Sequence, residues 1–248
     1  MLVQKPNLFL IGAQKSATTY LNQIFISTEL INTGKIKEPN YFCRSLTYQK
    51  RNFDDYLSNY IFKKRLKYSL DSSTGYFQPN IPDKNIFPSK RVFAFSPNAK
   101  IFGILRNPVD RYESAYNHHI LMGRIEPSEI IEKVLDKHLM VDIGKYSLII
   151  NQWKEYFKNL KFFLYDDLVE NKKLFLQDIF EFLGMNVDLN KIDLDRRFND
   201  TNIRMAKKKI NKKAKLSEEA RNELKDIYKN EVLELEGLIN RDLSKWLL

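Results

Sequence analysis

The 248-residue chain carries 41 Lys and Arg against 31 Asp and Glu, which gives a formal net charge of +10 at pH 7. This excess favours anionic partners such as nucleotides, acidic polysaccharides, nucleic acids or a membrane surface, although a lysine-rich solvated surface would give the same balance. The single cysteine, Cys43, excludes an internal disulfide and a cysteine-based zinc site.

No apolar run approaches the ~18 residues that a membrane span needs, and the early run LFLIGA is too short for a signal peptide. We therefore expect a cytoplasmic protein with no membrane span. The length fits a single domain over residues 1–248, because no linker or internal repeat divides the chain.

Short runs of β-prone residues alternate along the chain with stretches of helical periodicity. The β-prone runs are NLFLIG (7–12), KYSLD (67–71), KIFGILR (100–106) and KFFLYDDL (161–168). The helical stretches are 18–26, 51–67, 109–121, 147–157, 173–185 and 216–239. This alternation predicts an α/β fold with a P-loop-like parallel sheet flanked by helices. Ligands of such folds bind beyond the carboxyl ends of the strands, so the polar residues after each run predict a site there.

The first β-prone run ends in GAQKSATTYL, which looks like a nucleotide-binding loop with its residues displaced. A P-loop NTPase has Gly and Lys where this chain has Ala17 and Thr18, whereas Thr19 keeps the hydroxyl and Lys15 comes three residues early. The N–H groups at a helix start attract an anion, and Lys15 adds a charge. Without a Walker lysine or a Walker B sequence, the loop predicts a site for one phosphate group with less need of magnesium. Its expected binding residues are Gln14, Lys15, Ser16, Ala17, Thr18 and Thr19.

A second anion site is predicted by RNPVDRYESAY, which follows the run at 100–106. Arg106 stands at the strand end, and Ser114 lies two helical turns into the following helix. An arginine and a hydroxyl can together hold a second phosphate, the guanidinium binding it through two donors. Taken alone, the same pattern fits an arginine that only caps local structure.

Taken in order, these segments resemble the sulfotransferases that use 3′-phosphoadenosine 5′-phosphosulfate (PAPS). GAQKSATTYL is similar to their 5′-phosphosulfate loop and ILRNPVDRYESAY to their 3′-phosphate motif. KEPNYF (37–42) resembles the segment with the catalytic carboxylate in heparan-type and related bacterial members, and DSSTGYF (71–77), GKYSLIINQW and YDDLVENKKLFLQDIFEFLGM keep the family's order. The resemblance extends from about residue 7 to the closing DLSKW. It implies PAPS as donor, adenosine 3′,5′-bisphosphate (PAP) as product and no required metal.

The resemblance also implies the catalytic roles. Lys15 would neutralise charge that builds on the leaving phosphate. Glu38 would be the general base that takes a proton from the acceptor, although a surface salt bridge is its plain alternative. Its neighbours Lys35 and Lys37 favour the charged carboxylate, so Glu38 would be a weak base.

The acceptor is expected to lie near Lys37, Asp71 and Tyr76. Relatives often have Glu followed by Lys where this chain has Asp71 followed by Ser72, so a lysine contact to the cofactor or acceptor is missing. The KEPNYF segment favours a carbohydrate acceptor with a hydroxyl or amine, while a lipid or small metabolite remains open. The sequence predicts neither which particular acceptor is used nor the oligomeric state.

Other candidate residues have ordinary structural explanations. Another branch of the family uses a histidine base, but His118, His119 and His138 lie in no similar motif, so packing or surface roles are expected. Tyr146 is expected in the core and is a candidate to line the site. The basic run 204–213 corresponds to a loop that closes over the cofactor in relatives, or else to a solvated loop.

Two other classes of function remain open at this point. A nucleoside or nucleotide kinase would bind ATP with Mg²⁺, which the displaced lysine disfavours. A non-catalytic basic binding module would explain the charge but not two anion motifs at strand ends with Glu38 between them. No nucleic-acid-binding signature is present, so nucleic acid is not an expected partner.

Overall fold

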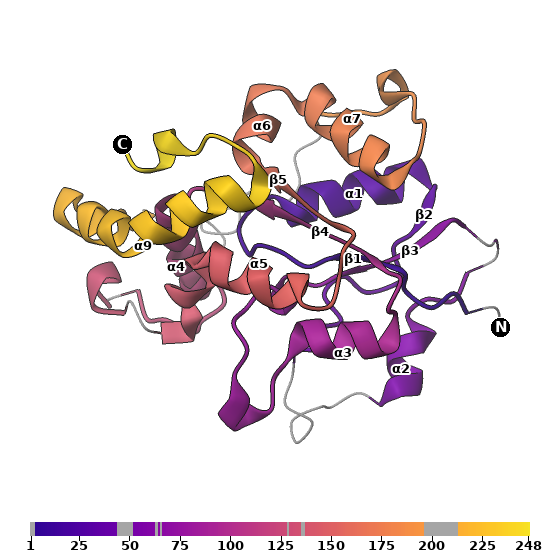
Figure 1. Cartoon of the computed structure of the whole chain (residues 1–248), viewed down its shortest axis with the longest axis horizontal. Helices are drawn as coiled ribbons and strands as arrows, with labels where there is room; N and C mark the ends of the chain where they lie inside the picture. Colours follow the sequence, from indigo (N-terminus) through magenta and orange to yellow (C-terminus); the bar gives the residue numbers. More distant parts are fainter. Residues whose placement is uncertain are drawn as a thin grey trace.

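The computed structural model describes residues 3–43, 52–62, 64, 66–127, 129–134, 137–195 and 213–248 (Figure 1). Within these ranges, five parallel strands form one sheet in the order β2-β3-β1-β4-β5. The strands are β1 (Leu8–Leu10), β2 (Ile31–Asn32), β3 (Tyr68–Ser72), β4 (Lys100–Leu105) and β5 (Leu160–Leu164). The predicted parallel sheet is therefore confirmed. Leu10 is paired with Ser72 on one side and Phe102 on the other, so the loop after β1 begins at the centre of the sheet.

Helices cover both faces of this sheet (Figure 1). They are α1 (Thr18–Thr28), α2 (Phe53–Ser58), α3 (Pro88–Phe95), α4 (Pro108–Leu121), α5 (Tyr146–Lys154), α6 (Tyr165–Glu170), α7 (Lys172–Leu183) and α9 (Glu218–Ile239). Helices α1 and α7 share one core, whereas α3, α4, α5 and α9 share the other. The flanked sheet predicted from the alternation of elements is thus observed.

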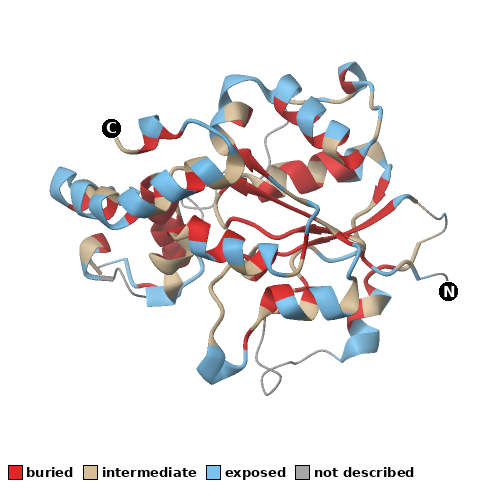
Figure 2. Ribbon diagram, in the orientation of Figure 1, coloured by how far each residue is buried: buried red, intermediate tan, exposed pale blue. Residues whose placement is uncertain are grey.

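Alternate residues of the central strands enter the two cores. In β1, Leu8 and Leu10 pack with α1 and α7, while Phe9 packs on the opposite side. Successive strand side chains point to opposite faces, so a strand buried on both faces needs a continuous apolar run. Figure 2 shows this arrangement as strands β1, β3 and β4 buried along most of their length between helices whose outer faces are exposed.

Two predicted elements differ most clearly from the observed ones. The run 161–168 is not strand throughout, because β5 ends at Leu164 and α6 begins at Tyr165. Asp166 and Asp167 lie in the first turn of α6, where the helix dipole favours negative charge. Of the predicted helix 51–67, the described residues form the shorter α2, whose first turn is capped by the Asn52 side chain through the Asp55 N–H.

Candidate active site

The loop after β1 continues along β4 before it turns away. The N–H groups of Ile11 and Ala13 donate to the carbonyls of Phe102 (3.0 Å) and Ile104 (2.8 Å). Gly12, with φ of 156°, packs so tightly that a Cβ there would lie 2.5 Å from the Cβ of Phe77. Only glycine fits this position, which fixes where the following residues leave the sheet.

The residues after Gly12 adopt conformations that non-glycine residues rarely take. Lys15 has φ of 70°, and Ala17 has φ of 62° at the N-terminus of α1, where no side chain caps the helix. The Oγ of Ser16 and the Oε1 of Gln14 are buried and have no hydrogen-bond partner among the described residues. Strained backbone and unpaired buried polar atoms cluster at functional sites, and here both occur at the start of a helix.

This loop forms one wall of a cavity of about 370 Å³. The cavity brings together four residues predicted from three separate motifs, Lys15, Glu38, and the pair Arg106 and Ser114. The complete lining is Gln14, Lys15, Ala17, Thr18, Thr19, Tyr20, Glu38, Thr74, Arg106, Ser114, His118, Leu121 and Tyr165. The predicted loop residue Ser16 is buried beneath this lining.

Arg106 lines this cavity and makes three contacts that fix its position. Its backbone carbonyl accepts a hydrogen bond from the Tyr146 hydroxyl (2.8 Å), and its Nη1 donates to the Lys15 carbonyl (3.4 Å). Its guanidinium lies 4.8 Å from the centroid of the Tyr165 ring, a cation–π distance. Tyr146 is buried and does not line the cavity, and its hydrogen bond with Arg106 is made to the backbone carbonyl.

Helix α4 carries Ser114 and His118 along the cavity wall. The helix starts directly after Arg106, because the Asn107 side chain accepts from the N–H of Val109 (2.9 Å) and Pro108 occupies the first turn. Residues four apart on a helix share a face, so the position of Ser114 also places His118 at the cavity. That spacing is the signal by which His118 could have been found as a lining residue.

The other two histidines pack together away from the lining. His119 is buried, and its ring stacks on that of His138 with centroids 4.5 Å apart. Burial lowers the pKa of His119 to about 3, which keeps the ring neutral. The packing role expected for these two histidines agrees with this geometry.

Glu38 is presented by a segment bonded to the end of β3. Its N–H donates to the carbonyl of Ser72 (2.9 Å), and its φ of 59° is left-handed. The Lys37 Nζ lies 2.6 Å from Glu38 Oε1, and these side chains are 20% and 38% exposed. Glu38 lines the cavity and Lys37 does not. An ion pair this exposed is weak and easily replaced.

Asp71 and Tyr76, which were expected near the acceptor, are not part of the cavity lining. Both are fully buried. The Asp71 carboxylate accepts hydrogen bonds from the hydroxyls of Tyr56 (2.9 Å), Ser73 (2.6 Å) and Tyr76 (2.8 Å). Burial raises the pKa of Asp71 to about 6, against the opposing effect of these hydroxyl donors.

Four further lining residues, Tyr20, Thr74, Leu121 and Tyr165, were not predicted. Thr74 follows β3 and Tyr165 follows β5, so both occupy strand ends, the place where the fold class puts its ligands. Tyr20 lies in the first turn of α1, and its hydroxyl donates to the carbonyl of Leu194 (3.1 Å). The strand-end rule alone could have identified Thr74 and Tyr165.

The basic run 204–213 lies outside the described residues except for Lys213. The described residues on either side of this run contact α1 and α4, two helices that contribute residues to the cavity lining. Leu194 is bonded to Tyr20, and Ala214 exchanges two hydrogen bonds of 2.9 Å with the side chain of Asn117 on α4. Among the described residues, no cluster of three or more His, Cys, Asp or Glu could hold a metal ion.

Comparisons with known proteins agree on one family. The sulfotransferase domain family matches residues 5–233. The chain is 23% identical over 269 aligned residues to the human bifunctional heparan sulfate N-deacetylase/N-sulfotransferase 2, covering 95% of this chain and 30% of that protein. The chain thus spans under a third of the length of that relative.

Solved sulfotransferase structures share the fold. A sulfotransferase from Alicyclobacillus acidocaldarius superposes with a TM-score of 0.77 at 24% identity, covering 98% of this chain and 99% of the other. Mouse sulfotransferase SULT7A1 complexed with PAP gives a TM-score of 0.55 at 15% identity, covering 93% and 85%. In the described residues no helix is long and apolar enough to cross a membrane. With a family match over nearly its whole length, the chain belongs to the sulfotransferase family.

Proposed function

We propose that this chain transfers the sulfuryl group of PAPS to a hydroxyl or amine of an acceptor, within one domain formed by residues 1–248. The observation that carries this proposal is the meeting of two anion-binding elements and one carboxylate in a single cavity. Lys15 and the start of α1 form the first element, Arg106 and Ser114 form the second, and Glu38 is the carboxylate. A kinase site or a plain basic surface does not require this combination.

The residues present fit PAPS. The 5′-phosphosulfate would lie against residues 14–19, where the uncapped N-terminus of α1 and the buried, unpaired Ser16 hydroxyl offer donors. The 3′-phosphate would bind Arg106 and Ser114. When bound, PAPS supplies an activated sulfuryl group with PAP as leaving group. That mouse sulfotransferase SULT7A1 was crystallised with PAP in the same fold supports this choice.

The chain's own residues supply proton transfer and charge neutralisation. Glu38 takes the proton of the acceptor hydroxyl or amine as the acceptor atom bonds to sulfur and the bond from sulfur to the leaving phosphate oxygen breaks. Lys15 offsets the negative charge that the leaving phosphate gains. In-line transfer depends on positioning, to which the hydrogen bonds from Arg106 to the Lys15 carbonyl (3.4 Å) and from the Glu38 N–H to the Ser72 carbonyl (2.9 Å) would contribute.

We propose a carbohydrate as acceptor. The support is the similarity over 95% of this chain to a relative whose name includes heparan sulfate N-sulfotransferase activity. N-deacetylated heparosan, which offers free amines on a sugar, is therefore the first probe. Desulfated heparan with N-acetyl groups retained tests hydroxyls in the same assay.

The experiment is transfer of labelled sulfate from PAPS to N-deacetylated heparosan by three proteins. Glu38→Gln should lower kcat about 100-fold or more while PAP affinity stays within about threefold, because a general base acts only in the transfer step. Glu29→Gln removes the same charge from an exposed position outside the cavity and should retain wild-type turnover. Wild-type turnover by Glu38→Gln would contradict the role of Glu38.

Because neutralisation of the leaving group's charge is assigned to Lys15, transfer should not require a divalent cation. Turnover in excess EDTA should match turnover in Mg²⁺ within about twofold, since a lysine replaces the metal's electrostatic role. Loss of turnover on chelation, restored by Mg²⁺, would contradict this and favour kinase-like chemistry.

A further inference from the structure

The buried carboxylate of Asp71 is linked to the segment that presents Glu38 by two hydroxyl groups. Ser73 Oγ donates to Asp71 Oδ1 (2.6 Å) and accepts from the N–H of Asn40 (3.1 Å). Tyr76 Oη donates to Asp71 Oδ2 (2.8 Å) and accepts from the N–H of Tyr41 (3.1 Å). Each hydroxyl therefore bridges the carboxylate to the backbone two or three residues beyond Glu38.

The charge on Asp71 determines which way these hydroxyls point. A carboxylate only accepts, so both hydroxyl protons are directed at it and both oxygen lone pairs face the segment. Hydrogen bonds to an ionised acceptor are also the stronger kind. With a neutral amide at this position the hydroxyl protons would no longer be held in one orientation, because the amide NH₂ group donates hydrogen bonds and competes with the hydroxyls as a donor.

Further contacts join the same buried cluster to residues 38–42. Tyr56 donates to Asp71 Oδ2 (2.9 Å), and its ring stacks on the ring of Tyr41 with centroids 4.6 Å apart. The Asn40 side chain donates to the carbonyl of Glu38 (3.1 Å). The left-handed backbone of Glu38 is costly, so it persists only where surrounding bonds hold it.

We infer that Asp71 is a positioning residue: it fixes the 38–42 segment, and thereby Glu38, through Ser73 and Tyr76, and does not itself contact the acceptor. This inference rests on the role proposed above for Glu38. Asp71 is fully buried and absent from the cavity lining, which leaves it no direct route to an acceptor.

Hydrogen exchange of individual backbone amides tests the inference without any acceptor. Tyr76→Phe and Asp71→Asn should speed exchange at the Tyr41 amide about tenfold, because the hydroxyl that accepts this N–H is lost or turned. Ser73→Ala should do the same at the Asn40 amide. Tyr60→Phe is the matched control, since it removes a hydroxyl buried in the same cluster that makes no hydrogen bond to the segment.

Wild-type exchange at the Tyr41 amide in Tyr76→Phe, or equal acceleration in Tyr60→Phe, would overturn the inference. The single-hydroxyl variants keep the test decisive even if Asp71→Asn fails to fold.

A double-mutant cycle on N-deacetylated heparosan then tests whether Asp71 acts through Glu38. Asp71→Asn should lower kcat about tenfold in the wild type, with PAP affinity within about twofold, and cause little further loss in Glu38→Gln. Equal losses in both backgrounds would mean that Asp71 acts independently of Glu38. A normal rate for Glu38→Gln would defeat the proposed base, and the exchange result would still decide whether Asp71 holds the segment.

Discussion

Three residues at the cavity, Lys15, Ala17 and Glu38, have left-handed backbone although none is glycine. Each such conformation costs on the order of 1 kcal/mol, so the fold must hold it by other contacts. For Glu38 those contacts are visible, since Ser72 and Asn40 bond its N–H and its carbonyl. The catalytic candidates thus depend on residues behind them as much as on their own chemistry.

Arg106 gives a selective prediction at this scale. If Arg106 binds the 3′-phosphate, Arg106→Ala should weaken PAP binding about 30-fold or more and leave 5′-AMP binding within about threefold, because a charge-assisted bidentate pair is lost only with PAP. Lys15→Ala should weaken the binding of both PAP and 5′-AMP. Calorimetric titration measures each affinity, and equal losses of PAP and AMP in Arg106→Ala would contradict the assignment.

Asp71 gives a pH dependence of stability. Its pKa is raised by burial from 3.8 to about 6, so the unfolded chain releases this proton at lower pH than the folded protein. The associated stability is complete below about pH 4 and is lost as the pH rises through about 6. Relative to Asp71→Asn, which cannot ionise, the free energy of unfolding of the wild type should fall by up to about 3 kcal/mol over that window. Urea denaturation across the window measures this difference, and a constant difference would be the contrary result.

At the scale of elements, the site is made by strand ends and the turns that follow them. β1 leads into the Lys15 loop and α1, β3 lies against the Glu38 segment, and β4 leads into Arg106 and α4. Each turn depends on a local feature, such as Asn107 capping α4 or Gly12 packing on Phe77. Displacing one turn should therefore disturb the cavity without abolishing the sheet.

Gly12 and Gly237 give a matched pair of substitutions. Gly12→Ala places a Cβ 2.5 Å from the Cβ of Phe77 at a φ that suits glycine, so it should lower the free energy of unfolding by about 2–4 kcal/mol. Gly237→Ala meets no atom within 4 Å in α9 and should raise it by about 0.5–1 kcal/mol. Denaturant unfolding compares the two, and a wild-type stability for Gly12→Ala would contradict the packing.

The fold and the meeting of Lys15 and Arg106 in one cavity were predictable because their signals are local. Continuous apolar runs predicted buried parallel strands, and the strand-end positions of Lys15 and Arg106 predicted their meeting. The place of Asp71 was not predictable in this way. Its type and its strand-end position match a substrate contact, and only the packing of Tyr56 and Tyr76 around it shows that it is enclosed.

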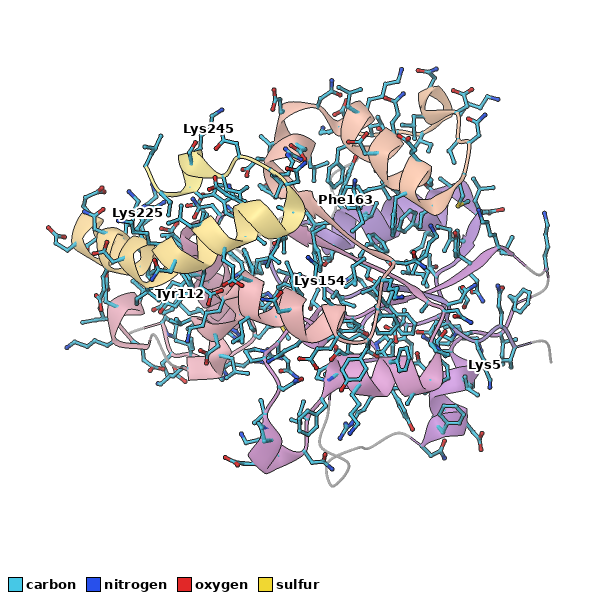
Figure 3. All side chains as sticks on the ribbon, viewed as in Figure 1. Lys5, Tyr112, Lys154, Phe163, Lys225 and Lys245 are labelled. Carbon is cyan, nitrogen blue, oxygen red and sulfur yellow. The ribbon has the colours of Figure 1, made fainter. Side chains whose placement is uncertain are left out.

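At the scale of the whole molecule, net charge is a poor guide to the site. The labelled Lys5, Lys154, Lys225 and Lys245 come from segments far apart in the sequence and extend from different parts of the structure (Figure 3). The formal charge of +10 is therefore not explained by one patch at the cavity. The cavity differs from the rest of the surface in its arrangement, because cationic and hydroxyl side chains that follow β1, β3, β4 and β5 surround one space.

The measurement that tests the central claim most directly is calorimetric titration of the wild-type protein with PAP, 5′-AMP and ATP–Mg²⁺ under identical conditions. Two separate phosphate sites in one cavity predict tight binding of PAP, much weaker binding of 5′-AMP and weak binding of ATP–Mg²⁺. Preference for ATP–Mg²⁺, or no binding of any of the three nucleotides, would contradict the assignment of this cavity to PAPS.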